Sequence, residues 1–256
     1  MVGIDRTGLA AGRPTFVTSD PLVASGVCLL DEHAVRHVRA LRLELNAMVG
    51  LRDGQGGVAE GRLVRVTKSR VHIDVLVVEQ REPLPAVHLL IPVADKERML
   101  WLAEKASELA CTSWRPVLWR RSRSVTPRGE GMSFQARVRA RMEGAMAQSE
   151  GAWLPQLFPE ANVERALLAA PEGDRVVLDP DGDPLVGVNA ATLTVPLTIA
   201  VGPEGGIELD EMEALERAGF RRASLSATIL RFETAAVAAL AIARTVLAAP
   251  LPGSPE

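Results

Sequence analysis

The spacing of apolar residues over the first 80 positions predicts several short strands and one helix. Residues 15–17 and 27–30 are short apolar runs typical of strands, whereas apolar positions three residues apart over 31–43 indicate a helix. Residues 58–66 and 71–78 predict a hairpin, because Val71, Ile73, Val75 and Val77 alternate with other residues at the period of a half-buried strand. This mixture favours a small β-barrel-like domain.

The pattern changes after a segment with two prolines at residues 81–85, which we take as the domain boundary. Beyond it, continuous apolar runs alternate with amphipathic stretches, an order typical of an α/β domain with a mainly parallel sheet. We therefore predict two domains, 1–82 and 83–256. The strands predicted in the second domain are 87–93, 116–119, 175–178, 197–201 and 223–225, and its helices are 97–110, one capped by Ser133 and ending near 149, 208–218 and 233–249.

Composition is ordinary for a soluble globular protein, with 47% hydrophobic and 24% charged residues among 256. No apolar run approaches the ~20 residues of a membrane-spanning helix, and no apolar segment follows a basic start, so we expect neither a span nor a signal peptide. Cys28 and Cys111 are too few for a disulfide framework, which favours reduced thiols and the cytoplasm. His33 and His37 are one helical turn apart but lack a third ligand, so we expect no metal site.

Charge is distributed unevenly along a chain whose net charge is −3. Residues 95–143 carry 11 basic and 6 acidic side chains, whereas residues 144–256 carry 7 basic and 16 acidic ones. The arginine-rich middle segment is a candidate phosphate-binding surface. A solvated helix face followed by a basic loop explains the same pattern equally well.

Two turns in the last quarter of the chain carry the candidate chemistry. The turn at residues 202–206, Gly-Pro-Glu-Gly-Gly, and the turn at residues 226–230 each follow a predicted strand. Loops at the ends of neighbouring parallel strands commonly form a ligand crevice. The first turn lacks the Lys-Ser/Thr of a phosphate-binding P-loop, and a tight strand-to-helix connection is the alternative explanation.

The residue types in these turns suit a flat ligand with polar edges. Glycines let backbone amides approach a ligand closely, and Glu204 offers an acceptor to hydroxyl or amine groups. Thr228, Ile229 and Leu230 combine apolar side chains with free backbone groups, as an adenine requires. Arg231 adds a fixed positive charge beside the crevice, unless it is neutralised by an ion pair with Glu204 or Glu233.

In combination, these residues resemble the RsmE family of 16S ribosomal RNA uridine-N3 methyltransferases, which belongs to the SPOUT superfamily. The resemblance rests chiefly on Gly-Pro-Glu-Gly-Gly at 202–206 and on Ile-Leu-Arg-Phe-Glu-Thr-Ala at 229–235. It extends to Glu-Lys-Ala-Ser-Glu-Leu at 104–109, Gln148-Ser149 with Leu154-Pro155, Leu-Arg-Leu at 41–43 and Asp53-Gly54. It therefore covers nearly the whole chain.

The resemblance implies a PUA-like RNA-binding β-barrel followed by a SPOUT α/β domain with a deep trefoil knot, in a homodimer. It implies that the protein methylates N3 of a uridine, number 1498 in 16S rRNA, with S-adenosylmethionine as donor. The partner would be ribosomal RNA or the small ribosomal subunit. The implied donor contacts are Leu178, Asp179, Pro180, Gly202, Pro203, Glu204, Gly205, Gly206, Leu225, Ser226, Thr228, Ile229 and Leu230.

Roles in the reaction follow from charge and position. We expect Arg231 to stabilise the anionic uracil oxygen, with Glu204 or Glu233 orienting it. Two alternatives stay open: methylation of another RNA uridine, for which the altered family pattern at Glu150 and Gly151 is the motive, or a non-catalytic RNA-binding assembly factor. The residues expected to bind RNA are Arg13, Arg36, Arg39, Arg42, Arg120, Arg121, Arg123 and Gln148.

Overall fold

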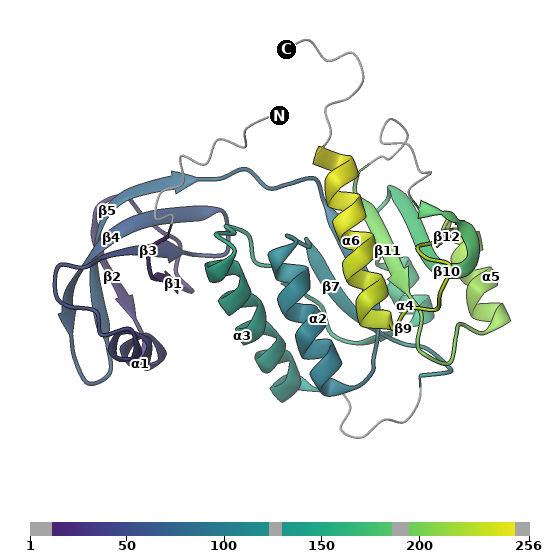
Figure 1. The fold of residues 1–256 in the computed structure, drawn as a ribbon, viewed down its shortest axis with the longest axis horizontal. Coiled ribbons are helices and arrows are strands. Elements are labelled where there is room, and N and C mark those ends of the chain that lie inside the picture. Colours follow the sequence, from purple (N-terminus) through teal and green to yellow (C-terminus); the bar gives the residue numbers. More distant parts are fainter. Residues whose placement is uncertain (1–11, 123–129, 186–194, 249–256) are drawn as a thin grey trace, which may run out of the picture. The chain divides into compact units, whose positions relative to one another are not determined.

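The computed structural model describes residues 12–122, 130–185 and 195–248, and the chain divides into two compact units (Figure 1). Unit 1 contains the described residues up to Pro83 together with Glu143–Leu154, and unit 2 contains the others. The chain therefore passes from unit 1 to unit 2, returns, and leaves again. The predicted division into residues 1–82 and 83–256 did not anticipate this return.

Unit 1 contains one curled five-stranded sheet with the strand order β1-β3-β4-β5-β2. Strands β1 and β3 are parallel, and the other neighbours are antiparallel. The strands predicted at 15–17 and 27–30 and the predicted hairpin are confirmed, whereas β3 was not predicted. The elements are β1 (Thr15–Val17), β2 (Gly26–Leu30), α1 (Glu32–Ala40), β3 (Met48–Arg52), β4 (Gly57–Val66) and β5 (Val71–Gln80).

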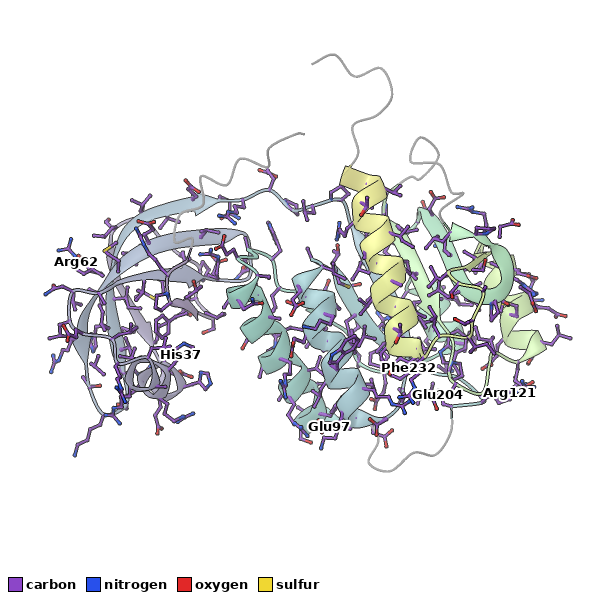
Figure 2. All side chains as sticks on the ribbon, viewed as in Figure 1. His37, Arg62, Glu97, Arg121, Glu204 and Phe232 are labelled. Carbon is purple, nitrogen blue, oxygen red and sulfur yellow. The ribbon has the colours of Figure 1, made fainter. Side chains whose placement is uncertain are left out.

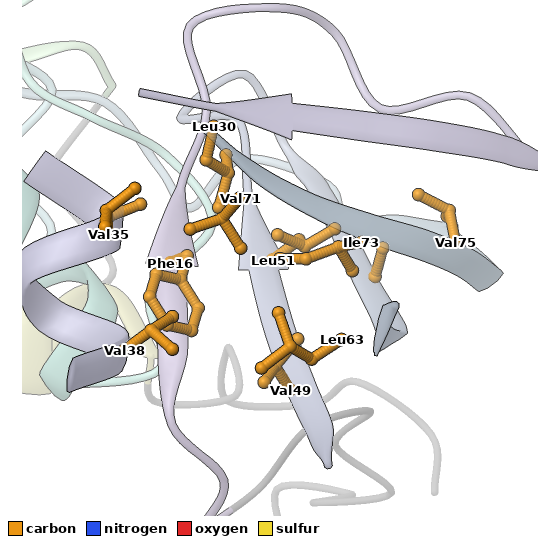
Figure 3. Packing of buried hydrophobic residues seen from close by; sticks show 12 residues of the cluster. Phe16, Leu30, Val35, Val38, Val49, Leu51, Leu63, Val71, Ile73 and Val75 are labelled. Atoms are coloured by element: carbon orange, nitrogen blue, oxygen red, sulfur yellow. The ribbon is translucent and has the colours of Figure 1, made fainter. Parts of the chain in front are cut away.

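The core of unit 1 lies between this sheet and α1, whose Val35 and Val38 pack against the strand residues (Figure 3). The predicted alternation along β5 holds as far as Val75, which is buried, but Val77 is 46% exposed. The pairing of β4 with β5 shifts by one residue between Glu60 and Gly61. Because a one-residue shift reverses which face a side chain occupies, Val78 packs against the core in place of Val77.

Backbone hydrogen bonds attach the returning segment to the turn between β3 and β4. The Gly56 N–H donates to the Ala152 carbonyl at 2.9 Å, and the Leu154 N–H donates to the Gly54 carbonyl at 3.0 Å. Arg52, which is fully buried, donates from Nε to the Gly151 carbonyl at 3.1 Å. The two positions that depart from the RsmE pattern, Glu150 and Gly151, therefore lie in a structural connection of unit 1.

Unit 2 contains a second sheet in which every neighbouring pair of strands is parallel, as predicted. The strand order is β12-β10-β11-β6-β7-β8, and β9 also pairs with β7. The two shortest strands, β8 and β9, were not predicted. The strands are β6 (Val87–Pro92), β7 (Ser113–Leu118), β8 (Gln156–Leu157), β9 (Ala161–Asn162), β10 (Asp174–Pro184), β11 (Leu197–Val201) and β12 (Arg221–Ser224).

Helices cover both faces of this sheet (Figure 1). On one face α6 packs against β6, β11 and α2, and its small buried residues Ala236, Ala239 and Ala243 allow this close approach. On the other face Leu90, Val177 and Ala200 join a core with residues from α4 and α5. The helices are α2 (Lys96–Glu108), α3 (Met132–Gln148), α4 (Val163–Leu168), α5 (Leu209–Arg217) and α6 (Phe232–Ala248).

Two details of the helices differ from expectation. Helix α3 begins at Met132, so Ser133 lies within the helix and does not have the predicted cap position. Helix α4 was not predicted, because six residues are too short for a clear apolar period. Within the described ranges, no helix is long and apolar enough to cross a membrane.

Candidate functional site

A pocket with a volume of about 420 Å³ lies in unit 2 where β11 and β12 end, beside residues 178–180 within β10. It is formed by Leu178–Pro180, by residues 201–207 and by residues from 223 to 230. Leu178 pairs with Val201 at the end of β11 and with Ala223 of β12, so residues 178–180 lie beside the loops that follow these two parallel strands. The turns at residues 202–206 and 226–230 therefore line the same pocket.

All thirteen residues predicted to contact a donor line this pocket. Sequence reasoning missed six further apolar lining residues, which come from β11, from β12, from the segment before α5 and from the first turns of α5 and α6. Only the position of these residues next to the two turns would have identified them. The additional lining residues are Val201, Ile207, Met212, Ala223, Phe232 and Ala235.

The glycines of residues 202–206 are required by the folded chain itself. Gly206 has φ +80°, a conformation that favours glycine. A Cβ at Gly202 would lie 2.7 Å from Ile207 Cγ1, and a Cβ at Gly205 would lie 3.0 Å from the Arg121 carbonyl oxygen. The turn is thus a tight strand-to-helix connection that also lines a pocket, so the two explanations offered by the sequence are compatible.

The second loop is shaped by the side chain of Ser226. Its Oγ accepts a hydrogen bond from the Thr228 N–H at 3.1 Å and lies 3.0 Å from Thr228 Oγ1. Ile229 follows with 88% of its surface exposed, whereas Leu230 is half-buried. The loop therefore presents one large apolar side chain to solvent at the pocket.

Arg98, which was not predicted, is the cation that holds the two candidate carboxylates. Its Nη1 forms a hydrogen-bonded ion pair with Glu204 Oε1, and its Nε lies 3.9 Å from Glu233 Oε1. Glu204 and Phe232, which are labelled in Figure 2, both line the pocket, whereas Glu233 is only 8% exposed. Arg231 is exposed and has no ion pair in the part of the chain that the structure describes. The alternative in which Arg231 pairs with Glu204 or Glu233 is therefore wrong.

Two predicted RNA-binding arginines, Arg120 and Arg121, are paired with acids at the start of α5. Arg120 donates from Nη1 to Asp210 at 2.9 Å, and this pairing raises the pKa of Arg120 and lowers the pKa of Asp210. Arg121 makes a two-point contact with Glu208, at 2.6 Å from Nε and 2.9 Å from Nη2. These pairs reduce the positive charge expected of the segment.

The remaining predicted RNA-binding residues belong to unit 1, except Arg123, which lies outside the described residues. Arg39, Arg42 and Gln148 are exposed. Arg13 lies 2.6 Å from Glu60, and Arg36 lies 3.4 Å from Glu32 one helical turn away.

Two further groups that are candidates for chemistry lie outside the pocket, one in β6 and one in the segment that precedes β7. His88 Nδ1 lies 2.7 Å from Ser113 Oγ, and burial lowers the pKa of His88. Burial raises the pKa of Cys111 to about 12, and its thiol donates to the Ser113 carbonyl at 3.0 Å. Over the described ranges, no group of three or more His, Cys, Asp or Glu side chains is placed to hold a metal ion.

Comparisons with known proteins agree with this geometry. Residues 80–244 match a family described as an RNA methyltransferase domain. The ribosomal RNA small subunit methyltransferase E of Synechocystis is 29% identical over 209 residues, which are 79% of this chain and 67% of that protein. The enzyme of the same name from Rickettsia conorii is 26% identical over 242 residues, 90% of this chain and 93% of the relative.

Among solved structures, one similar chain is a ribosomal RNA small subunit methyltransferase E from Neisseria gonorrhoeae, whose crystal structure is bound to S-adenosyl methionine. The two share 27% sequence identity with a TM-score of 0.82, over 91% of this chain and 98% of the other.

Proposed function

Since the chain belongs to the RsmE family of RNA methyltransferases, we propose that it transfers a methyl group from S-adenosylmethionine to N3 of a uridine in 16S ribosomal RNA. By resemblance the target is uridine 1498. The observation that carries the proposal is the convergence of all thirteen expected donor contacts on one pocket of about 420 Å³. We further propose that the protein acts in the cytoplasm, on ribosomal RNA or the small subunit.

The pocket residues match the chemical parts of S-adenosylmethionine. Leu225, Ile229 and Leu230 offer apolar surface for the faces of an adenine, and the loop backbone offers polar groups for its edges. The Glu204 carboxylate is an acceptor for hydroxyl or amine hydrogens. When bound, this donor supplies a methyl group activated by the neighbouring sulfonium.

The protein's own contribution is alignment and charge. Uridine N3 is a weakly acidic imide nitrogen, and it must lose its proton before it becomes a nucleophile. We propose that the Arg231 guanidinium, which is exposed at the start of α6, stabilises the uracil oxygen that gains negative charge. Glu204 and Glu233 form ion pairs with Arg98 and not with Arg231. We therefore no longer propose that they orient Arg231.

Recognition of RNA is proposed for unit 1 as a PUA-like domain. The exposed side chains of Arg39 and Arg42 and the exposed Gln148 would contact the RNA, with the arginines at its phosphates. A base flipped out of its stack would enter the pocket of unit 2.

We also propose the remaining SPOUT features, a deep trefoil knot in unit 2 and a homodimer that includes α6. Ala236 and Ala239 of α6 are buried by packing within the same chain, so they are not available to a second copy. Half-buried residues of α6, including Val237 and Ile242, remain for a contact with a second copy.

The proposed function is tested by incubating the protein with radiolabelled S-adenosylmethionine and small ribosomal subunits that lack N3-methyluridine, and by mapping the modified base. We expect one methylated uridine in 16S rRNA, and we expect Arg231→Ala to retain donor binding but lose most of the transfer rate. A variant that bound donor normally and methylated at the full rate would contradict the role given to Arg231.

The mapping experiment and a separate binding measurement distinguish the two alternatives. Methylation mapped to a different RNA uridine would support a changed target, for which the departures at Glu150 and Gly151 are the motive. Calorimetry that detected no S-adenosylmethionine binding would support a non-catalytic RNA-binding assembly factor.

A further inference from the structure

We propose that Arg98 is a positioning residue for the donor pocket, which it serves by fixing the Glu204 carboxylate at the pocket wall and joining it to α6. The inference rests on the proposed function. It is based on the contact between Arg98 and Glu204. The local sequence does not indicate this contact, because the two residues are 106 positions apart in the chain.

The backbone of Arg98 is held where the α2 helix begins. Asp95 caps the helix, and its Oδ1 accepts hydrogen bonds from the N–H groups of Glu97 at 3.1 Å and Arg98 at 3.0 Å. The next residue, Met99, is fully buried. With its neighbours fixed on both sides, the Arg98 side chain extends from a rigid base.

Glu204 depends on this cation for its position. It is the charged member of the turn at residues 202–206, and 39% of its side chain is exposed while it lines the pocket. Among the described residues, its carboxylate forms an ion pair with Arg98 alone. Without that contact, the side chain gains rotamer freedom and solvation, and the cost of ordering it falls on ligand binding.

Glu233 supplies the second anchor for the guanidinium. It lies in the first turn of α6, 8% exposed, and its Oε2 is buried with no hydrogen-bond partner among the described residues. Arg98 Nε, at 3.9 Å from Oε1, is the cation recorded beside this buried carboxylate. A buried carboxylate without a nearby cation is unfavourable, so Glu233 in turn holds Arg98 between the turn and the helix.

The guanidinium is suited to this double contact in a way that an ammonium group is not. Its planar fork presents separate N–H groups, here Nη1 to Glu204 and Nε towards Glu233, whereas lysine is a single point charge on a flexible stem. Arg98→Lys is therefore expected to retain the charge but lose part of the positioning.

The test measures the dissociation constant for S-adenosylmethionine by calorimetry in Arg98→Ala, Glu204→Ala and the double variant. A buried hydrogen bond to a charged group changes an equilibrium constant by about tenfold or more. Since 33% of the Arg98 side chain is exposed, we expect Arg98→Ala to weaken donor binding by about three- to tenfold. Arg98→Lys should fall between the wild type and Arg98→Ala. In the Glu204→Ala background, Arg98→Ala should add less than about twofold.

A thermal melt of the free proteins separates positioning from folding, because loss of the Glu233 contact lowers the melting temperature without requiring a change in donor affinity. If Arg98→Ala is too unstable, Arg98→Lys is used for the cycle. Arg217→Ala is the matched control, since Arg217 forms an exposed ion pair with Glu213 on α5, 3.6 Å apart, away from the pocket lining. It should bind donor like the wild type.

The outcomes are distinct. Equal donor affinity in Arg98→Ala and the wild type, or the same loss in the presence and absence of Glu204, would overturn the assignment of Arg98. A wild-type protein that did not bind S-adenosylmethionine at all would instead refute the proposed function on which the inference rests.

Discussion

Replacement of Glu211 by alanine tests how the loop after β7 is joined to the helix that follows the pocket turn. Glu211 lies in the first turn of α5 and is 8% exposed. Its Oε1 accepts the Arg120 backbone N–H at 2.9 Å, and its Oε2 accepts the Glu208 N–H at 3.1 Å. One carboxylate therefore caps the helix and attaches a loop 91 residues away.

The expected loss follows from these contacts. A hydrogen bond to a charged acceptor contributes about 1.5–3 kcal/mol, and a carboxylate at a helix N-terminus adds about 0.3–1 kcal/mol. The Arg120 N–H can be hydrated once the acceptor is removed, and the variant no longer buries a charge. We therefore expect Glu211→Ala to lower the free energy of unfolding by about 2–3 kcal/mol, which lowers the melting temperature by about 5–10 °C.

The assay is urea unfolding of the purified protein followed by tryptophan fluorescence. The signal comes from four tryptophans, of which Trp119 is 3% exposed and adjacent to Arg120. Asp210→Ala is the matched control, because it removes a neighbouring carboxylate whose contact with Arg120 is solvent-exposed. If Glu211→Ala were no more destabilising than Asp210→Ala, the capping and anchoring role derived for Glu211 would be refuted.

Three further outcomes are expected. Gly182→Ala should destabilise unit 2 by about 1–3 kcal/mol, because its Cβ would lie 2.5 Å from the Ala223 nitrogen. Gly144→Ala should stabilise the protein by about 0.5–1 kcal/mol, because the space around its Cβ in α3 is open. Urea unfolding that ranked the two variants in the reverse order would contradict both predictions. Burial lowers the pKa of His88 from 6.5, so the unfolded chain binds more protons than the folded one and stability falls as pH drops below 6.5. His88→Asn should make the free energy of unfolding depend less on pH between about pH 5 and 7. The same pH dependence in the variant and the wild type would contradict this role of His88. Because burial raises the pKa of Cys111 to about 12, iodoacetamide should modify it only in denatured protein, and labelling of the native thiol detected by mass spectrometry would contradict this.

Elements with a strong period were predictable from the sequence, and those set by pairing were not. The continuous apolar runs of β6 and β11 and the amphipathic α2 are found where expected. Strand β3 has a glycine at its centre and only five residues, so its identity depends on the partners β1 and β4. The exposure of Val77 depends on a shift in pairing that leaves no mark in the pattern of β5 itself.

The candidate site divides in the same way. Residues 202–206 and 226–230 each follow a predicted strand, so the rule that parallel strands end at a common edge was enough to bring these two turns together, whereas Leu178–Pro180 were expected only from the resemblance. That rule could not identify Arg98, because Arg98 lies on α2, 106 residues before Glu204 in the chain. The ion pair of Arg120 with Asp210 could not be predicted for the same reason. We therefore expected residues 95–143 to carry more unpaired positive charge than they do.

The return of residues 143–154 to unit 1 affects the order in which the protein folds during synthesis. A nascent chain that has extended only to Pro83 lacks the Gly151 carbonyl that accepts the hydrogen bond from the buried Arg52. Unit 1 is therefore completed only after the first four elements of unit 2, from β6 to α3, have been synthesised. The N-terminal unit is consequently not a module that a single cut in the gene would release, and grafting it onto another protein would require both of its pieces.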